Sequence, residues 1–231
     1  METFSYGHYY ARFPSNYERI VQSWIRDVND TAYPILIEVL GFKPKINHYI
    51  VDFKNIDINL RKYGVVAYYA GVKTIDDISG GYIAVDPVLI DDLKEYPKNL
   101  EGGIVYETIH GFLQPLKFRK SWNRNTILKT DESFDIIFEV EFDNRIGLID
   151  FKNHLYNQFY HTSSANSGQI YFSLLWDIRE RYGWKPIQQF FKMLRDGDTA
   201  LVIEGDVDGF YTILNSLICE DIWQLFENHG F

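Results

Sequence analysis

The 231-residue sequence contains a single cysteine, Cys219. One cysteine cannot form an internal disulfide, and zinc sites built from several cysteines are excluded for the same reason. The sequence also lacks any apolar run near the roughly 18 residues that a membrane-spanning helix needs. Basic residues are in the minority, 23 against 32 acidic ones, which gives a formal net charge of −9. This charge disfavours non-specific binding to nucleic acid and to anionic membrane surfaces.

The amino terminus, Met1 to Tyr6, has neither the basic start nor the apolar run of a secretory signal peptide. As written, the sequence predicts a cytoplasmic protein, and it would predict a secreted one if a leader had been removed ahead of Met1. Aromatic residues are abundant, with 17 Tyr and 17 Phe. They predict an aromatic-rich core and tyrosines that line a groove.

The pattern of the chain predicts one α+β domain over residues 1–231, with a strand-rich part at 1–98 and a helical part at 99–231. Alternating or continuous apolar runs predict strands at 4–13, 46–53, 65–70 and 82–88. Helical spacing predicts helices at 15–28, 31–40, 99–113, 130–142, 167–182, 186–196, 208–217 and 221–229. We expect Pro34 to break or kink the first helical region.

The segment from Gly102 to Pro115 is the centre of the functional prediction. Read as a helix, it places Tyr106 and Glu107 on the same face as His110, at spacings of four and three residues. An apolar stripe on another face would anchor this helix in a core. A simpler alternative is that Glu107 and His110 form an ordinary hydrogen-bonded pair on a helix surface.

A glycine-rich strand ending in proline, residues 80–87, suits an exposed sheet edge. Such an edge can pair with an extended peptide by strand addition, so the sequence predicts substrate-binding residues here: Gly81, Tyr82, Ile83 and Ala84. The alternative is an edge strand that needs its glycines only for a turn.

A further predicted helix begins near Thr130 and carries three acidic residues at spacings of three and four: Glu132, Asp135 and Glu139. We expect them on the side opposite the buried apolar residues. An alternative role for the first two is to complement the dipole of the helix.

Taken in order, these segments resemble a gluzincin-type zinc metallopeptidase domain, in particular the enhancin-like and plant basic-secretory-protein-like groups. The stretch Gly102 to Phe112 resembles their zinc-binding helix, and Gly80 to Asp86 resembles the edge strand that lies above it. Asp131 to Phe138 is similar to the helix that brings a glutamate ligand, and the last helices resemble the family's carboxy-terminal ones. The resemblance implies a zincin-like fold and a peptide or protein substrate.

In this family, the helix carries H-E-x-x-H, in which two histidines bind zinc and the glutamate is the general base. Carried over by position, the resemblance implies His110 and Glu132 as metal ligands and Glu107 as the base. Tyr106 stands where the first histidine belongs. A phenol, with an ordinary pKa near ~10, must lose a proton to bind zinc well.

Another side chain would have to complete a zinc site. The remaining histidines are His8, His48, His154, His161 and His229, and His161 is the best placed in a polar loop. Glu139 would make the site richer in carboxylates, and Tyr160 is a second loop candidate beside His161.

Three functions follow from this sequence. The first is a metallopeptidase-like pseudoenzyme with a degenerate zinc site and a retained groove for a peptide or protein. The second is an active zinc hydrolase with an altered ligand set. The third is a non-catalytic α+β binding or structural protein in which Glu-x-x-His is accidental. The sequence sets no oligomeric state.

Overall fold

The computed structural model describes residues 1–62, 64–75, 77–88, 90, 98–113, 124–160, 167–196 and 207–231, with only the backbone at 98–102, 124–133 and 167–169. The fold is α+β, as predicted, with a mixed sheet in the amino-terminal half and mainly helices after it. The chain forms two compact units, which are described separately. Unit 1 comprises Met1–Ile37 and Lys43–Gln114, and unit 2 comprises Glu38–Phe42 and Pro115–Phe231.

Unit 1 contains a five-stranded sheet with the order β1-β2-β3-β5-β4. Its strands are β1 Glu2–Tyr6, β2 Tyr9–Phe13, β3 Tyr49–Phe53, β4 Ala67–Ile75 and β5 Ile78–Val85. The three inner strands run parallel to one another, and each outer strand is antiparallel to its neighbour. The outer strand β4 carries an irregularity between Tyr69 and Val72.

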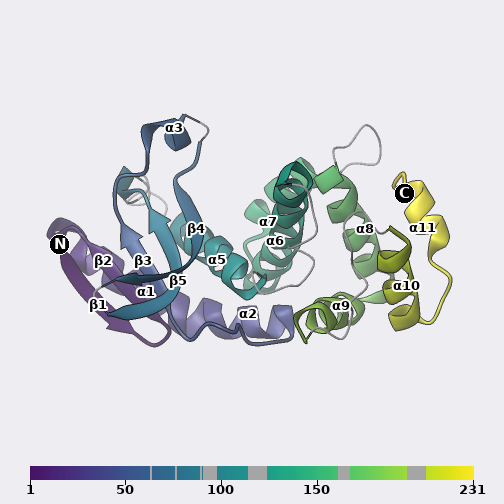
Figure 1. Ribbon diagram of the computed structural model, residues 1–231, viewed down its shortest axis with the longest axis horizontal. Coiled ribbons are helices and arrows are strands. Elements are labelled where there is room, and N and C mark those ends of the chain that lie inside the picture. The colour runs from purple at the N-terminus through teal and green to yellow at the C-terminus, as the bar shows by residue number, and fades with distance from the viewer. Residues whose placement is uncertain are drawn as a thin grey trace. The chain divides into compact units, whose positions relative to one another are not determined.

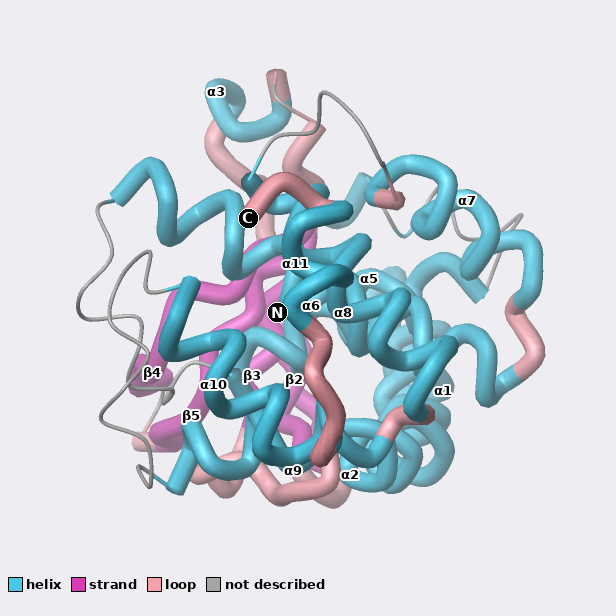
Figure 2. Tube along the Cα trace, turned by 90° about the vertical axis from the view of Figure 1, so that its right-hand side faces the viewer, coloured by secondary structure: helices cyan, strands magenta, loops and turns pink. Residues whose placement is uncertain are grey.

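Helical segments of unit 1 gather on one face of this sheet (Figure 1). They are the 3-10 turn η1 Ser15–Tyr17, α1 Glu18–Asp27, the π-helical turn η2 Val28–Ala32, the start of α2 Tyr33–Leu40, and α5 Lys98–Leu113. The short helix α3 Ile58–Arg61 lies apart from them in Figures 1 and 2. Buried tyrosines fill the layer between sheet and helices, as the aromatic composition predicts.

The opposite face of the sheet has a smaller core of Ile50, Tyr82 and Ala84. The ammonium groups of Lys54 and Lys73 lie 4.9 and 4.4 Å from the centre of the Tyr82 ring. Long side chains of the sheet itself therefore cover this second core.

Two strand predictions were wrong. Residues 4–13 form a hairpin and not one strand, because Gly7, with a φ of +55°, turns the chain between β1 and β2. The strand expected at the edge, β5, lies inside the sheet between β3 and β4. Its proline, Pro87, follows the end of the strand, so it does not interrupt the hydrogen bonds on either side.

Unit 2 is helical. Its helices are α6 Arg124–Ile146, α7 Ile149–Phe159, α8 Ser167–Tyr182, α9 Lys185–Asp196, α10 Val207–Ile218 and α11 Trp223–Asn228. Helix α6 packs against both α7 and α8, and α9 packs against α8 and α10. Ring contacts among aromatic residues join α6 to α9 and α8 to α10, for example Phe138 with Phe191 and Tyr171 with Phe210.

Several helix boundaries differ from the prediction. Helix α6 begins at Arg124 and not near Thr130, and α7 was not predicted. The α-helix is interrupted where Pro34 was expected to break or kink it, since the π-helical turn η2 separates α1 from α2, in which Pro34 is the second residue. Helix α2 ends at Leu40, before Gly41 at a φ of +77°, as expected.

Across the described ranges, no helix is both long and apolar enough to cross a lipid bilayer.

Candidate functional site

Helix α5 carries the central predicted residues. Its apolar stripe of Val105, Ile109 and Phe112 is fully buried, which confirms the predicted anchoring face. Glu107 is also buried, with 7% of its side chain exposed, whereas 19% of the His110 side chain is exposed. Tyr106 is partly exposed. The helix therefore holds a carboxylate just below the surface, beside an imidazole that solvent reaches.

The structure brings the three predicted residues of α5 together. The Nε2 atom of His110 lies 3.8 Å from the Oε2 atom of Glu107. The rings of Tyr106 and His110 meet edge to face, with centroids 4.8 Å apart. This spacing confirms the shared helix face, and it follows from helix geometry alone.

A fourth residue, Tyr69, reaches this face from strand β4. Its ring lies nearly parallel to that of His110, with centroids 6.3 Å apart. Helix α5 packs against β4 along this side. Sequence reasoning missed Tyr69 because its position depends on β4 being the edge strand next to α5. The sequence shows only that Tyr69 is a tyrosine in a predicted strand, which does not indicate a position beside His110.

The predicted substrate-binding strand is not available as an edge. The main chain of Gly81, Tyr82, Ile83 and Ala84 pairs with β3 on one side and β4 on the other. These residues are buried. A Cβ atom at Gly81 would overlap the side chain of Ile46, so this glycine serves close packing. The edge strand beside α5 is β4.

The other predicted site residues fall outside this face or outside the described side chains. Glu132 lies in α6, with its side chain outside the described residues, and His161 lies in the undescribed range 161–166. Glu139 is only 9% exposed, and Asp135 is fully buried. The side of α6 that was predicted to lie opposite its buried residues is therefore itself buried at these two positions, in a helix that packs against both α7 and α8.

Tyr160 belongs to a separate network in unit 2. Its hydroxyl donates to Oδ1 of Asp177 at 3.0 Å, and Nε2 of His229 lies 2.9 Å from Oδ2 of the same carboxylate. Burial, followed by the hydrogen bond to Asp177, raises the pKa of Tyr160 to about 12. Since 3% of the His229 side chain is exposed, this network fastens the carboxy-terminal segment to α8.

The described side chains do not by themselves make up a zinc site, and Glu132 and His161 are not among them. The described residues contain no group of three His, Cys, Asp or Glu side chains that could hold a metal. Of the histidines proposed to complete the site, His8 stacks on Tyr33 at 4.1 Å and His229 bonds to Asp177. His48 and His154 are exposed. Among these residues, His110 and Glu107 provide one imidazole and one carboxylate.

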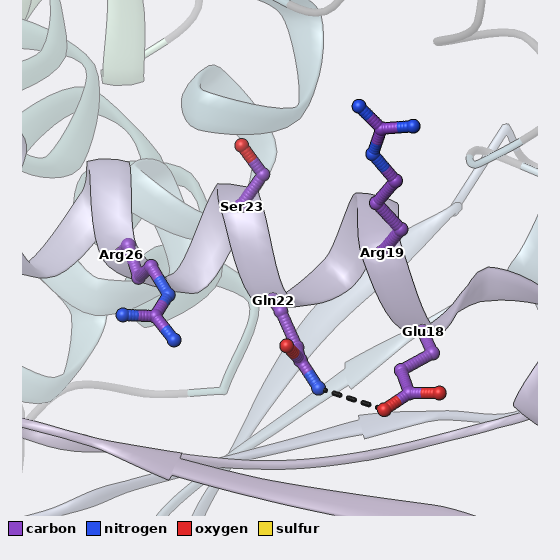
Figure 3. Close-up of a pocket in the computed structure, with 5 residues that line it drawn as sticks. All are labelled: Glu18, Arg19, Gln22, Ser23 and Arg26. Carbon is purple, nitrogen blue, oxygen red and sulfur yellow. Dashed lines mark hydrogen bonds between the residues drawn. The ribbon is translucent and has the colours of Figure 1, made fainter.

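A hollow on the surface of α1 is polar but has no convergent groups. It is lined by Glu18, Arg19, Gln22, Ser23 and Arg26. Figure 3 shows Arg19 and Ser23 pointing to one side of the helix and Glu18 and Gln22 to the other, where they share a hydrogen bond. Arg26 instead lies 5.0 Å from the ring centres of Phe4 and Tyr6. This arrangement does not define a ligand.

Comparison of the chain with protein-family models, with curated proteins and with solved structures finds no match. The geometry of the α5 face is therefore the basis for a functional proposal.

Proposed function

We propose that this protein is a metallopeptidase-like pseudoenzyme that binds a peptide beside α5 without hydrolysing it. The observation that carries the proposal is the α5 face itself, where Glu107 and His110 lie 3.8 Å apart and Tyr106 occupies the place of the missing histidine. A gluzincin-like zinc site needs two histidines on this helix.

The position of β4 supports peptide binding. The strand pairs with β5 on one side, and it packs against α5 near Tyr69 and His110. An extended peptide that adds to its other side would run past the α5 face. The resemblance to gluzincins implies an edge strand above the active-site helix, and in this proposal β4, the outer strand that packs against α5, has that role instead of β5.

The metal half of the proposal is tested by restoring the histidine with Tyr106→His. We expect the wild-type protein, purified without chelators, to contain no stoichiometric zinc and to cleave nothing in a broad peptide library. The variant should bind zinc at least about 100-fold more tightly, because the added imidazole completes a ligand pair on one helix face.

A pair of histidines four residues apart can bind zinc weakly on any helix, so a control is needed. The double variant Tyr106→His/Glu132→Gln removes the carboxylate that the resemblance assigns as a ligand, and should lose most of the gained affinity. Equal zinc affinity in the single and double variants would contradict the metallopeptidase ancestry. Stoichiometric zinc in the wild type would contradict the loss of the site.

The peptide half is tested by hydrogen exchange with peptides selected for binding. We expect slower exchange at backbone amides of β4, residues 67–75, and no change at β1, the other edge of the same sheet, which serves as an internal control. Protection at β1 alone, or at neither edge, would contradict peptide binding beside α5.

A further inference from the structure

Three hydroxyl groups, two on the sheet and one on α5, form hydrogen bonds to α5 where it meets the sheet. The hydroxyl of Thr108 donates to the carbonyl of Ile104 at 2.7 Å. Because that uses its one proton, the Tyr9 hydroxyl, 3.1 Å away, must donate to Thr108. The hydroxyl of Tyr49 donates to the Thr108 carbonyl at 3.2 Å. Each hydroxyl proton therefore has an acceptor on α5.

The three residues that carry these hydroxyls are deeply buried. Tyr9 is 1% exposed, and Tyr49 and Thr108 are 0% exposed. Burial raises the pKa of both tyrosines, Tyr49 well above its usual value, so both remain protonated donors at any physiological pH. Phenylalanine and valine would fill the same space without polar atoms that need partners. Buried polar groups of this kind favour one orientation of the helix, because a rotated helix would leave buried hydroxyl groups without hydrogen-bond acceptors.

Gly111 adds a steric constraint at the same place. A Cβ atom there would lie 2.5 Å from Cε1 of Tyr49, so the helix backbone lies directly on the tyrosine ring. Successive residues of a helix are about 100° apart. Thr108 and Gly111 lie against the tyrosines of β2 and β3, so Tyr106 lies on the far side of the helix, and His110 lies toward the edge strand β4, where its ring stacks on Tyr69. The partial exposure of Tyr106 and His110 agrees with this orientation.

We infer that Tyr9, Tyr49 and Thr108 are positioning residues that fix the rotation of α5 and thereby hold Glu107 and His110 in place beside β4. They contact neither a ligand nor a metal. The inference rests on the proposed function in assigning Glu107 and His110 to a site, while the hydrogen bonds themselves are independent of it.

The test uses Tyr49→Phe and Thr108→Val, with Tyr33→Phe as a matched control. Tyr33 lies in the same aromatic cluster, 5.8 Å from the ring of Phe112 on α5, and its interaction with the described side chains of this helix is a ring contact. We expect faster amide exchange over residues 106–113 in the two test variants. The control should leave exchange there unchanged, with global stability measured for all three.

Each substitution is then combined with Tyr106→His. Tyr49→Phe and Thr108→Val should weaken zinc binding about 10-fold, as loss of an outer contact does in metal sites, and Tyr33→Phe should not. Unchanged exchange in α5, or exchange that rises equally in the control, would overturn the inference. If Tyr106→His binds no zinc, the proposed function fails, and the exchange measurement alone decides whether the three residues fix the helix.

Discussion

At the scale of single residues, the carboxyl group of Asp143 in α6 destabilises the folded protein when it is ionised, so the stability of the protein depends on pH. Asp143 is 2% exposed, and its Oδ2 atom has no hydrogen-bond partner in the described part of unit 2. Burial raises the pKa of this carboxyl from 3.8 to about 7. The folded protein therefore binds the proton more tightly than the unfolded chain does. The free energy of unfolding should fall as pH rises from about 4 to about 7.

Replacing Asp143 by Asn removes this charge. At pH 8 we expect the free energy of unfolding of the variant to exceed that of the wild type by on the order of 1–3 kcal/mol, so the variant unfolds at a higher urea concentration. Near pH 5 this difference in free energy should disappear. Urea unfolding of both proteins between pH 5 and pH 8 measures this difference in the free energy of unfolding. The control is Asp27→Asn, which changes the net charge equally at an exposed position. A pH-independent difference would mean that the Asp143 carboxyl does not titrate in this range.

Tyr106 and Glu139 show how far single residues can be read from the sequence. The contact of Tyr106 with His110 was predictable, because a helix fixes the distance between residues four apart. The burial of Glu139 was not predictable, because it depends on which helices cover α6. An acidic residue is usually exposed, and the burial of this one follows from the tertiary packing of α6 and not from its own sequence pattern.

At the scale of elements, the contact of α5 with the sheet depends on Gly111. Alanine is the better helix former by about 1 kcal/mol. Its Cβ would nevertheless lie 2.5 Å from the buried ring of Tyr49. Overpacking of this kind costs about 1–3 kcal/mol.

We therefore expect Gly111→Ala to destabilise unit 1, with faster amide exchange in α5 and β3. Chemical denaturation with hydrogen exchange measures both effects. A gain in stability would show that helix propensity outweighs the steric contact, and that α5 does not rest on the Tyr49 ring as the structure has it.

Helix α5 was predicted nearly to its ends, and the identity of the edge strand was predicted wrongly. An amphipathic stripe such as Val105, Ile109 and Phe112 is a local pattern. The place of a strand in a sheet is not local. Strand β5 is rich in glycine and is followed by a proline, which are sequence features of an edge strand. In the structure, its glycines instead allow the close approach of Ile46 and of the His48 backbone.

At the scale of the whole molecule, the two compact units should unfold as separate cooperative steps. In calorimetry we expect the measured enthalpy to exceed the van't Hoff enthalpy of a single transition. Gly111→Ala should shift only the transition of unit 1, and Asp143→Asn only that of unit 2. One transition with equal enthalpies, moved by both variants, would show that the chain unfolds as one unit.

The sequence by itself determined the α+β class, most helices and the face of α5 that unites Tyr106, Glu107 and His110, because these depend on the periodicity of nearby residues. The tertiary structure decided the order of the strands, the burial of the acidic face of α6, and the arrival of Tyr69 beside His110. Each of these is a contact between segments distant along the chain. Local periodicity says which face of a segment is buried, but not what covers it.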